Sequence, residues 1–251
     1  GLQHQDGHSL LQASVVPNIL AYDPAFAFEI AIIIQNGIKR MFYDNEDIFY
    51  YLTLENENYE HFPMPNNVEE GIIKGIYLFK KGENSKIKVQ LFGSGSIINE
   101  VIEASKMLQE DWGISSDIWS VTSYSELRRD GEDIYRYNRL NPDKNDKQPY
   151  INEVLTNHEG PVIAVSDYVK LVAEQVSPYI TKRYFTALGT DGFGRSDTRQ
   201  NLRSHFEINK EYIVISALDA LKREKKINAS LVVDALKKYK INTKKENPIK
   251  K

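Results

Sequence analysis

From about residue 70 onwards, strand-like and helix-like segments alternate along the chain, and this alternation constrains the fold more than any other feature. Short β-branched or aromatic runs at residues 87–92, 161–165 and 184–188 are predicted strands. Segments with apolar residues at helical spacing, such as 97–108 and 168–179, lie between them. Because parallel strands need crossover connections, the pattern predicts an α/β fold, with a mostly parallel sheet flanked by helices on both faces.

The first third of the chain is less regular. We predict a short strand at residues 13–16 and a helix capped by Asp23 that carries Phe26, Ile30 and Ile33 on one face. Gly37 is a possible end of that helix, and a buried strand is predicted at 48–54. Residues 55–70 have a linker composition rich in Asn and Pro. We therefore divide the chain into two domains, 1–65 and 66–251.

Further elements of the second domain follow from the same patterns. Strands are predicted at 72–79 and 118–121, and a helix at 126–140 that Gly131 interrupts or kinks. Additional helices are predicted at 198–206 and, as a pair, within 210–239. No internal repeat with a fixed period is present, so repeat architectures are excluded.

Composition excludes several classes of protein. The 251 residues are 41% hydrophobic and 27% charged, which is ordinary for a globular protein and excludes collagen-like, coiled-coil and disordered chains. Cysteine is absent, so disulfides, thiolate zinc sites and a catalytic thiol are excluded, as expected for a reducing compartment such as the cytoplasm. Neither a signal peptide nor a run of about 18 apolar residues is present, so we expect no membrane association. The chain begins at Gly1, and we expect it to be a piece of a longer protein.

Charge is unevenly distributed along the chain. Residues 222–251 hold eleven Lys/Arg and three Asp/Glu, whereas the whole chain has a net charge of −3. Such a basic tail would suit nucleic acid or an acidic partner, and it would equally suit a solvated helix face. No nucleic-acid-reading motif accompanies the lysines, so no nucleic-acid partner is expected.

The segment from Gln3 to Ser9 is the first candidate site. It holds His4, Asp6 and His8, and histidine is the side chain best suited to acid–base chemistry near neutral pH. Gly7 would permit a tight turn that points both imidazoles one way. A metal site is less favoured because no third soft ligand is nearby, and an ordinary polar loop remains the alternative.

Three other segments follow predicted strands. A Gly-Ser-Gly-Ser turn at 93–96 offers amides to an anion, or is simply a tight turn with Ser96 near a helix N-cap. The glycine-rich loop 189–199 carries Arg195 and Arg199, with Ser196 or Asp197 as a helix cap; it either binds a carboxylate or phosphate or is a structural loop. Residues 54–59 could line a cleft at the carboxyl end of a strand, or lead into solvent.

Taken in order, these segments resemble one known family. The motifs are GLQHQDGHS, PNILAYDPAFAFEIA, VQLFGSGSI, SVTSYSELRRDGEDIYRYNRL and ALGTDGFGRSDTRQNLRSHFE. They are similar, from Gly1 to the end, to the C-terminal portion of the homodimeric pyruvate dehydrogenases (acetyl-transferring). These enzymes are the decarboxylating first components of pyruvate dehydrogenase complexes.

The resemblance implies a transketolase-like fold, made here of the end of the pyrimidine-binding middle domain and a complete C-terminal domain. It implies thiamine diphosphate and magnesium as cofactors of the whole enzyme, with the residues that hold the diphosphate and the metal outside this chain. It also implies oxidative decarboxylation of pyruvate, with transfer of the acetyl group to a lipoyl group.

The same resemblance implies partners and site residues. The partners are a second copy of the protein, dihydrolipoyl acetyltransferase and dihydrolipoyl dehydrogenase. His4 first, and His8 second, match the family loop that reaches the reactive end of the cofactor. Family members often read His-Glu-Asp-Gly-His-Ser-His there, whereas this chain has Gln5 and Leu10 at two of those positions. The alternative is a noncatalytic docking or dimerisation module with a basic tail, and we expect the 251-residue piece alone to be inactive.

Overall fold

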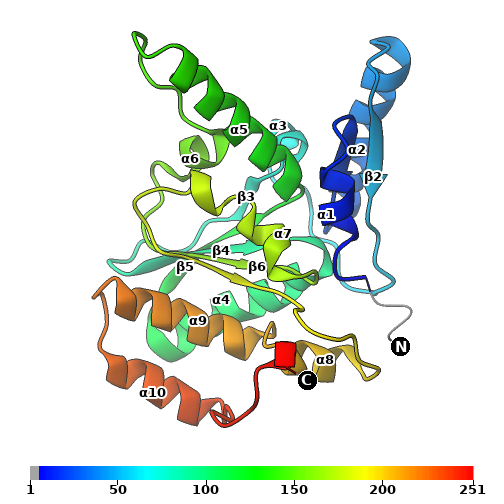
Figure 1. The fold of residues 1–251 in the computed structure, drawn as a ribbon. Helices are drawn as coiled ribbons and strands as arrows, with labels where there is room; N and C mark the ends of the chain where they lie inside the picture. The colour runs from blue at the N-terminus through cyan, green and yellow to red at the C-terminus, as the bar shows by residue number, and fades with distance from the viewer. Residues whose placement is uncertain (1–5, 251) are drawn as a thin grey trace.

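The computed structural model describes residues 6–250, and its centre is a five-stranded sheet (Figure 1). Its strands lie in the order β3-β5-β4-β6-β7, and their bounds are Tyr77–Lys80 (β3), Lys88–Gly93 (β4), Ser115–Ser120 (β5), Val162–Val165 (β6) and Phe185–Leu188 (β7). Every neighbouring pair is parallel except β3 and β5, which are antiparallel. The predicted α/β class with a mostly parallel sheet is therefore confirmed.

Helices cover both faces of this sheet, as Figure 1 shows. One face packs against α4 (Ile98–Trp112) and α9 (Lys210–Arg223), with α10 (Ala229–Lys238) packed on α9. The other face packs against α5 (Tyr124–Leu140), α6 (Tyr150–Leu155) and α7 (Lys170–Glu174). The side chains of β4 alternate between these two cores, with Val89 and Leu91 in one and Phe92 in the other.

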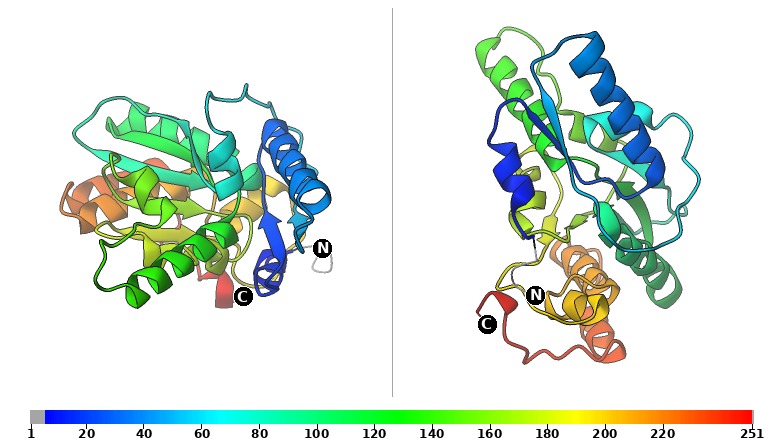
Figure 2. Two further views of the ribbon diagram at one scale, coloured as in Figure 1. Left: turned by 90° about the horizontal axis from the view of Figure 1, so that it is seen from above. Right: turned by 90° about the vertical axis from the view of Figure 1, so that its right-hand side faces the viewer.

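A second, two-stranded parallel sheet lies beside the first (Figure 2, right). It pairs β1 (Ile19–Tyr22) with β2 (Phe49–Leu52), and α2 (Ala27–Ile38) makes the crossover, continuing as a π-helical turn over Lys39–Tyr43. A short helix, α1 (Ser9–Ser14), precedes it. The Asp23 amide donates to the Thr122 carbonyl at 2.8 Å and so joins the end of β1 to the segment after β5.

Three predictions for the first third of the chain are wrong. Residues 13–16 are not a strand: Ala13 and Ser14 end α1, and Val15 is 75% exposed. Asp23 does not cap α2; the helix begins after Phe26, where Glu29 accepts the amides of Ala25 and Phe26. The helix also runs through Gly37, which therefore does not end it.

Predictions for residues 66–251 fail in three places. The helix predicted at 168–179 is only the five-residue α7, followed by a separate 3-10 turn at Ser177–Tyr179. The segment 72–79 contains the end of helix α3 (Glu69–Lys74), which stops at Gly75 with a φ of 107°, and β3 begins only at Tyr77. Helix α5 passes Gly131 without a break. A Cβ at this glycine would lie 2.5 Å from the ring of Tyr179, so the glycine serves close packing rather than a kink. Within the described residues, no helix combines the length and apolar character needed to cross a membrane.

Candidate functional site

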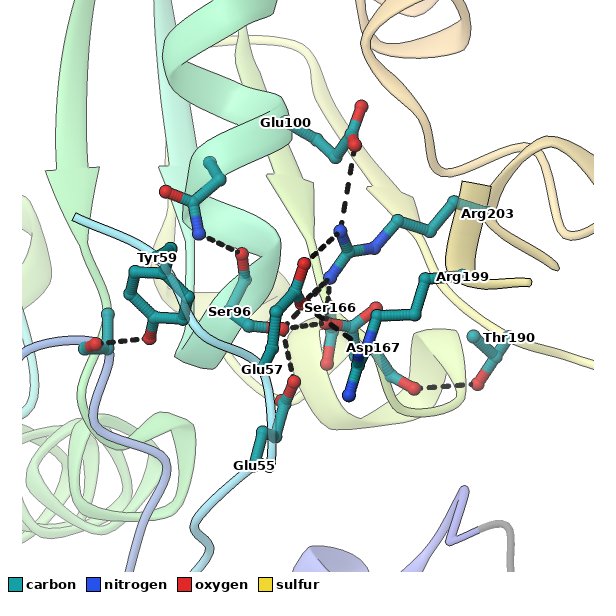
Figure 3. A network of polar contacts seen from close by, with 12 residues as sticks. Glu55, Glu57, Tyr59, Ser96, Glu100, Ser166, Asp167, Thr190, Arg199 and Arg203 are labelled. Carbon is teal, nitrogen blue, oxygen red and sulfur yellow. Dashed lines mark hydrogen bonds and ion pairs between the residues drawn. The ribbon is translucent and has the colours of Figure 1, made fainter. Parts of the chain in front are cut away.

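Polar side chains gather where the carboxyl ends of the two sheets face each other. Asp23 follows β1, Glu55 follows β2, Ser96 follows β4 and Asp167 follows β6. Because ligands of parallel α/β sheets bind at the carboxyl ends of the strands, this junction is the first place to look for a site. Ser96, Glu55 and Asp167 form one hydrogen-bonded group (Figure 3), and Asp23 lies beside it, accepting a hydrogen bond from Thr53 at 2.7 Å.

A cavity of about 470 Å³ opens at this junction. Its polar wall contains Asp6, His8, Glu55, Asp167, Arg199 and Arg203, and its apolar wall contains Val169, Phe193, Leu202, Phe206 and Ile208. A concave site with an apolar wall and a few convergent polar groups is typical of small-molecule binding.

Arg203 is the cation at the centre of the group. Its Nη2 donates to Glu57 Oε2 at 2.7 Å and its Nη1 to Glu57 Oε1 at 3.3 Å, a two-pronged contact. Asp167 Oδ2 lies 3.5 Å from the same guanidinium and Glu100 Oε1 3.6 Å from it. Only 9% of the Arg203 side chain is exposed, so this is a largely desolvated pair.

Helix α8 (Arg199–His205) presents Arg203 together with Arg199. Thr198 caps the helix, its Oγ1 accepting the Asn201 amide at 3.3 Å, so Ser196 and Asp197 are not the N-cap. Residues four apart share one helix face, so both arginines point at the segment that follows β2. Arg199 donates to the side-chain oxygen of Asn56 at 2.6 Å.

Ser96 links the two carboxyl groups nearest the cavity. Its hydroxyl contacts Glu55 Oε2, lies 3.1 Å from Asp167 Oδ2, and accepts from Arg203 Nη2 at 2.9 Å. Ser96 therefore lies inside the 3-10 turn Gly95–Ile97 as a network residue, rather than at the N-cap of α4.

Acidity in this group is weakened. Burial, with some contribution from Asp167 and Glu29, raises the pKa of Asp23 to about 7. Burial and the charges of Asp167 and Asp23 raise the pKa of Glu55. Burial also raises the pKa of Asp167. Glu57 differs: burial opposes ionisation, but Arg203 holds its pKa below the ordinary range.

Gly95 allows the carboxyl groups to come this close. Its φ is +50°, in the left-handed region, and its amide donates to the Asp23 carbonyl at 3.0 Å. A Cβ built there would lie 2.8 Å from Asp23 Oδ1 and 2.9 Å from Glu55 Oε1. The turn predicted at 93–96 is thus confirmed, and its glycine is required by two carboxylates.

The described part of the histidine segment, Asp6 to His8, borders the same cavity. His4 lies outside the described residues. His8 is exposed and lines the cavity, and the Asp6 carboxylate accepts its amide at 3.1 Å and that of Ser9 at 2.9 Å. The Gly7 carbonyl accepts the Val169 amide at 2.9 Å, which fastens this segment to the turn after β6.

The glycine-rich loop 189–199 forms another wall of the cavity. Phe193 is 72% exposed and lines the opening, and Thr190 Oγ1 donates to the Asp167 carbonyl at 3.0 Å. Asp191 accepts the Lys170 amide at 3.1 Å, which holds the loop against α7. The loop is therefore both structural and part of the cavity wall.

Sequence reasoning missed Asp23, Asp167 and Arg203 as members of the site. It placed residues 54–59 at a possible cleft, and Glu55 and Glu57 do lie there. The signal that could have found Asp167 was its position directly after the buried strand at 161–165. Nothing local in the sequence marks Arg203, because its partners lie 146 and 107 residues away.

Several cations of the basic tail are paired with the body of the protein. Lys238 Nζ lies 2.8 Å from Asp111, Arg223 Nε lies 2.6 Å from Asp219, and Lys222 also pairs with Asp219. Lys245 Nζ lies 3.3 Å from Glu207. These pairs account for part of the positive charge as surface ion pairs.

Comparison with known proteins agrees with this fold. Residues 75–209 match the family model described as the transketolase-like TK C-terminal domain, and residues 1–62 match the middle domain of the pyruvate dehydrogenase E1 component. The chain belongs to the family of proteins that carry the transketolase-like C-terminal domain.

Two curated relatives illustrate the similarity. It is 47% identical over 251 residues to the pyruvate dehydrogenase E1 component of Cupriavidus necator and 48% identical over 249 residues to that of Escherichia coli (strain K12). Each comparison covers 99% of this chain and 28% of the relative, so the chain spans less than a third of their length. The resemblance expected from the sequence is confirmed.

Solved structures show the same fold at lower identity. Transketolase from Leishmania mexicana matches with a TM-score of 0.60 and 20% identity, over 89% of this chain and 28% of that one. Transketolase from Campylobacter jejuni matches with a TM-score of 0.60 and 21% identity, over 87% of this chain and 29% of that one. The transketolase-like fold is confirmed.

Proposed function

We propose that this chain is part of the thiamine-diphosphate-dependent first component of a pyruvate dehydrogenase complex. That component decarboxylates pyruvate and transfers the acetyl group to lipoyl on dihydrolipoyl acetyltransferase. The observation that carries the proposal is 47–49% identity to E1 components along 99% of the chain. The cavity supports the proposal, because acid–base side chains such as Asp6 and His8 line it.

The cofactors fit the whole protein and not the described residues alone. Among residues 6–250, no group of three His, Asp or Glu side chains is arranged to hold a metal ion. On the resemblance, we propose that residues outside this chain hold the magnesium and the diphosphate of the cofactor, and we derive no step through them. The proposed contribution of this chain is a wall of the active site, in which His4 first, and His8 second, act as proton donor or hydrogen-bond partner to the substrate oxygen.

The remaining parts of the proposal concern organisation. We propose domains at 1–65 and 66–251, supported by family models that end at residue 62 and begin at residue 75. We also propose a homodimer, association with dihydrolipoyl dehydrogenase in the complex, and a cytoplasmic location. Co-purification of the complete protein with the two other components, and its mass in solution, test these statements.

The 251-residue chain by itself is expected to be inactive. Without residues that bind the metal and the diphosphate, it should not hold the cofactor tightly. We expect no release of carbon dioxide from pyruvate when the purified chain is supplied with thiamine diphosphate and magnesium. Cofactor-dependent turnover by this chain would contradict the assignment, and the complete protein is the positive control.

His4 is expected to matter more than His8. In the complete protein, His4→Ala should lower turnover at least about tenfold, the low side of typical acid–base contributions. His8→Ala is the matched variant, since His8 lies at the exposed rim of the cavity and should cost less. Steady-state kinetics with pyruvate measure both, and unchanged turnover after His4→Ala would remove His4 from the site.

A further inference from the structure

Hydrogen bonding around Ser96 does not balance if every nearby carboxyl group is ionised. A hydroxyl group donates one hydrogen bond and accepts two. Ser96 Oγ accepts from Arg203 Nη2 at 2.9 Å, contacts Glu55 Oε2, and lies 3.1 Å from Asp167 Oδ2. The hydroxyl can donate its single proton to only one carboxylate. An oxygen of the other carboxylate would then face Ser96 Oγ with no hydrogen between the two atoms.

We propose that Glu55 and Asp167 share one proton through Ser96, and that this proton positions Gly7 and His8 at the cavity. With the proton in place, one carboxyl donates to Ser96 Oγ, Ser96 donates to the other carboxylate, and Arg203 donates to Ser96. All of the contacts then pair a donor with an acceptor. The inference concerns the chemical state of the cavity wall and does not depend on the proposed activity.

The surrounding charges favour retention of this proton. Charged and titratable groups of every neighbouring element face Glu55 and Asp167. They are Asp23 after β1, Glu57 and Tyr59 after β2, Glu100 on α4, Tyr168 after β6, Arg199 and Arg203 on α8, and Asp6 and His8 before α1. The Arg203 guanidinium is already committed to Glu57 by two hydrogen bonds. Asp23 is 4% exposed; its Oδ1 accepts from Thr53 Oγ1 and its Oδ2 has no hydrogen-bond partner among the described residues, so its ionised form would add negative potential beside the pair. Both members of the pair have raised pKa values, as this arrangement requires.

The turn after β6 connects the shared proton to the histidine segment. Asp167 and Val169 lie in this turn, and the Val169 amide donates to the Gly7 carbonyl at 2.9 Å, next to His8. Loss of the proton leaves two carboxylates in contact with one hydroxyl, and their repulsion moves the turn. Gly7 and His8 then move with it, so Glu55 and Asp167 are positioning residues for the histidine segment.

The test counts titrating protons in single and double variants of the complete protein. Infrared spectra recorded from about pH 5 to about pH 9, a range chosen to span the raised carboxyl pKa values, follow the carbonyl stretch of protonated carboxyl groups. We expect Glu55→Gln and Asp167→Asn each to remove the same single titration, and the double variant to remove no more than either. Glu57→Gln is the matched control, since Glu57 is paired with Arg203, and it should remove none.

Each other outcome overturns the proposal. Additive losses in the double variant would mean two independent acids, and no loss in either single variant would mean that both groups are ionised. If Asp167→Asn does not fold, Ser96→Ala replaces it, because removal of the hydroxyl that links the two carboxyl groups should remove the same titration, and an unchanged titration in that variant would refute the shared proton. In ¹⁵N-labelled protein, the Val169 amide resonance should shift with the same midpoint and stay still in Glu55→Gln. A resonance that does not move with the transition would refute the positioning role.

Discussion

At the scale of single residues, Gly95 decides whether the site can assemble. Two constraints fall on it at once: a left-handed backbone, and carboxylate oxygens within 3 Å of where a Cβ would stand. Gly113, which ends α4, has the first constraint without the second, since its φ is +64° and nothing lies within 4 Å of its Cβ position.

Gly95→Ala is therefore expected to destabilise the protein more than Gly113→Ala. The Gly113 variant should cost about 1 kcal/mol in free energy of unfolding, the usual cost of a left-handed alanine. The Gly95 variant should cost at least about 2 kcal/mol more, because Asp23 and Glu55 must move apart. Urea unfolding of the purified protein measures both free energies. Equal losses of stability in the two variants would show that the Asp23 and Glu55 side chains move apart without cost.

Asp23 shows why residue-scale prediction fails here. An Asp before a Pro and an apolar helical pattern is an ordinary N-cap signal. In the structure its carboxylate instead accepts from Thr53 Oγ1 at 2.7 Å, thirty residues along the chain. The cap is replaced by Glu29, whose carboxylate receives two amides as well as Tyr77 and Ser120 hydroxyls. Tertiary contacts between distant segments decided the outcome, and no local pattern encodes them.

At the scale of elements, Arg203 ties helix α8 to the segment after β2. The pair with Glu57 is largely desolvated, whereas Arg199 on the same helix face is 47% exposed. Breaking a buried pair by removal of one partner leaves the other charge uncompensated.

Arg203→Met is expected to cost about 3 to 5 kcal/mol in free energy of unfolding, the range for a broken buried pair. Arg199→Met, the matched control, should cost at most about 1 kcal/mol because its ion pair is exposed. Thermal and urea unfolding measure the difference. A similar cost for both variants would mean that the Glu57 contact is as weak as a surface pair.

Element prediction succeeded where one signal dominated. The strands β4, β6 and β7 and the helices α8, α9 and α10 lie close to their predicted positions because their apolar patterns are strong and bounded by turn residues. The prediction of one strand at 72–79 was wrong because its apolar residues belong to two elements, α3 and β3. The left-handed Gly75 ends α3, and β3 begins at Tyr77. Residues 13–16 misled because β-branched Val15 and Val16 suggested a strand, although they lie in the turn after α1.

At the scale of the whole molecule, a parallel two-stranded sheet and the parallel strands of the five-stranded sheet direct their carboxyl ends at one cavity. The five-stranded sheet could be predicted from the alternation of elements, and the two-stranded sheet only in part. Its strands are separated by a helix, as the rule for parallel connections requires. How the two sheets face each other could not be predicted, because it depends on contacts such as Asp23 with Thr122 and Ser123 with Ala21.

The strand order of the larger sheet also sets the sequence in which the molecule opens. β4 is hydrogen-bonded on both sides, to β5 and β6, and is buried from Val89 to Gly93, whereas β1 and β2 pair only with each other in the described residues. Amide hydrogens exchange with solvent through local openings, and doubly paired, buried strands open last. The strands β5 and β6 are likewise paired on both sides and buried. The amides of β4, β5 and β6 should therefore be among the slowest to exchange with deuterium, and those of β2 should exchange well before them. The two parts of the cavity wall thus differ in how often they open locally. The part that follows β4 stays folded, while the part that follows β2 opens and closes many times.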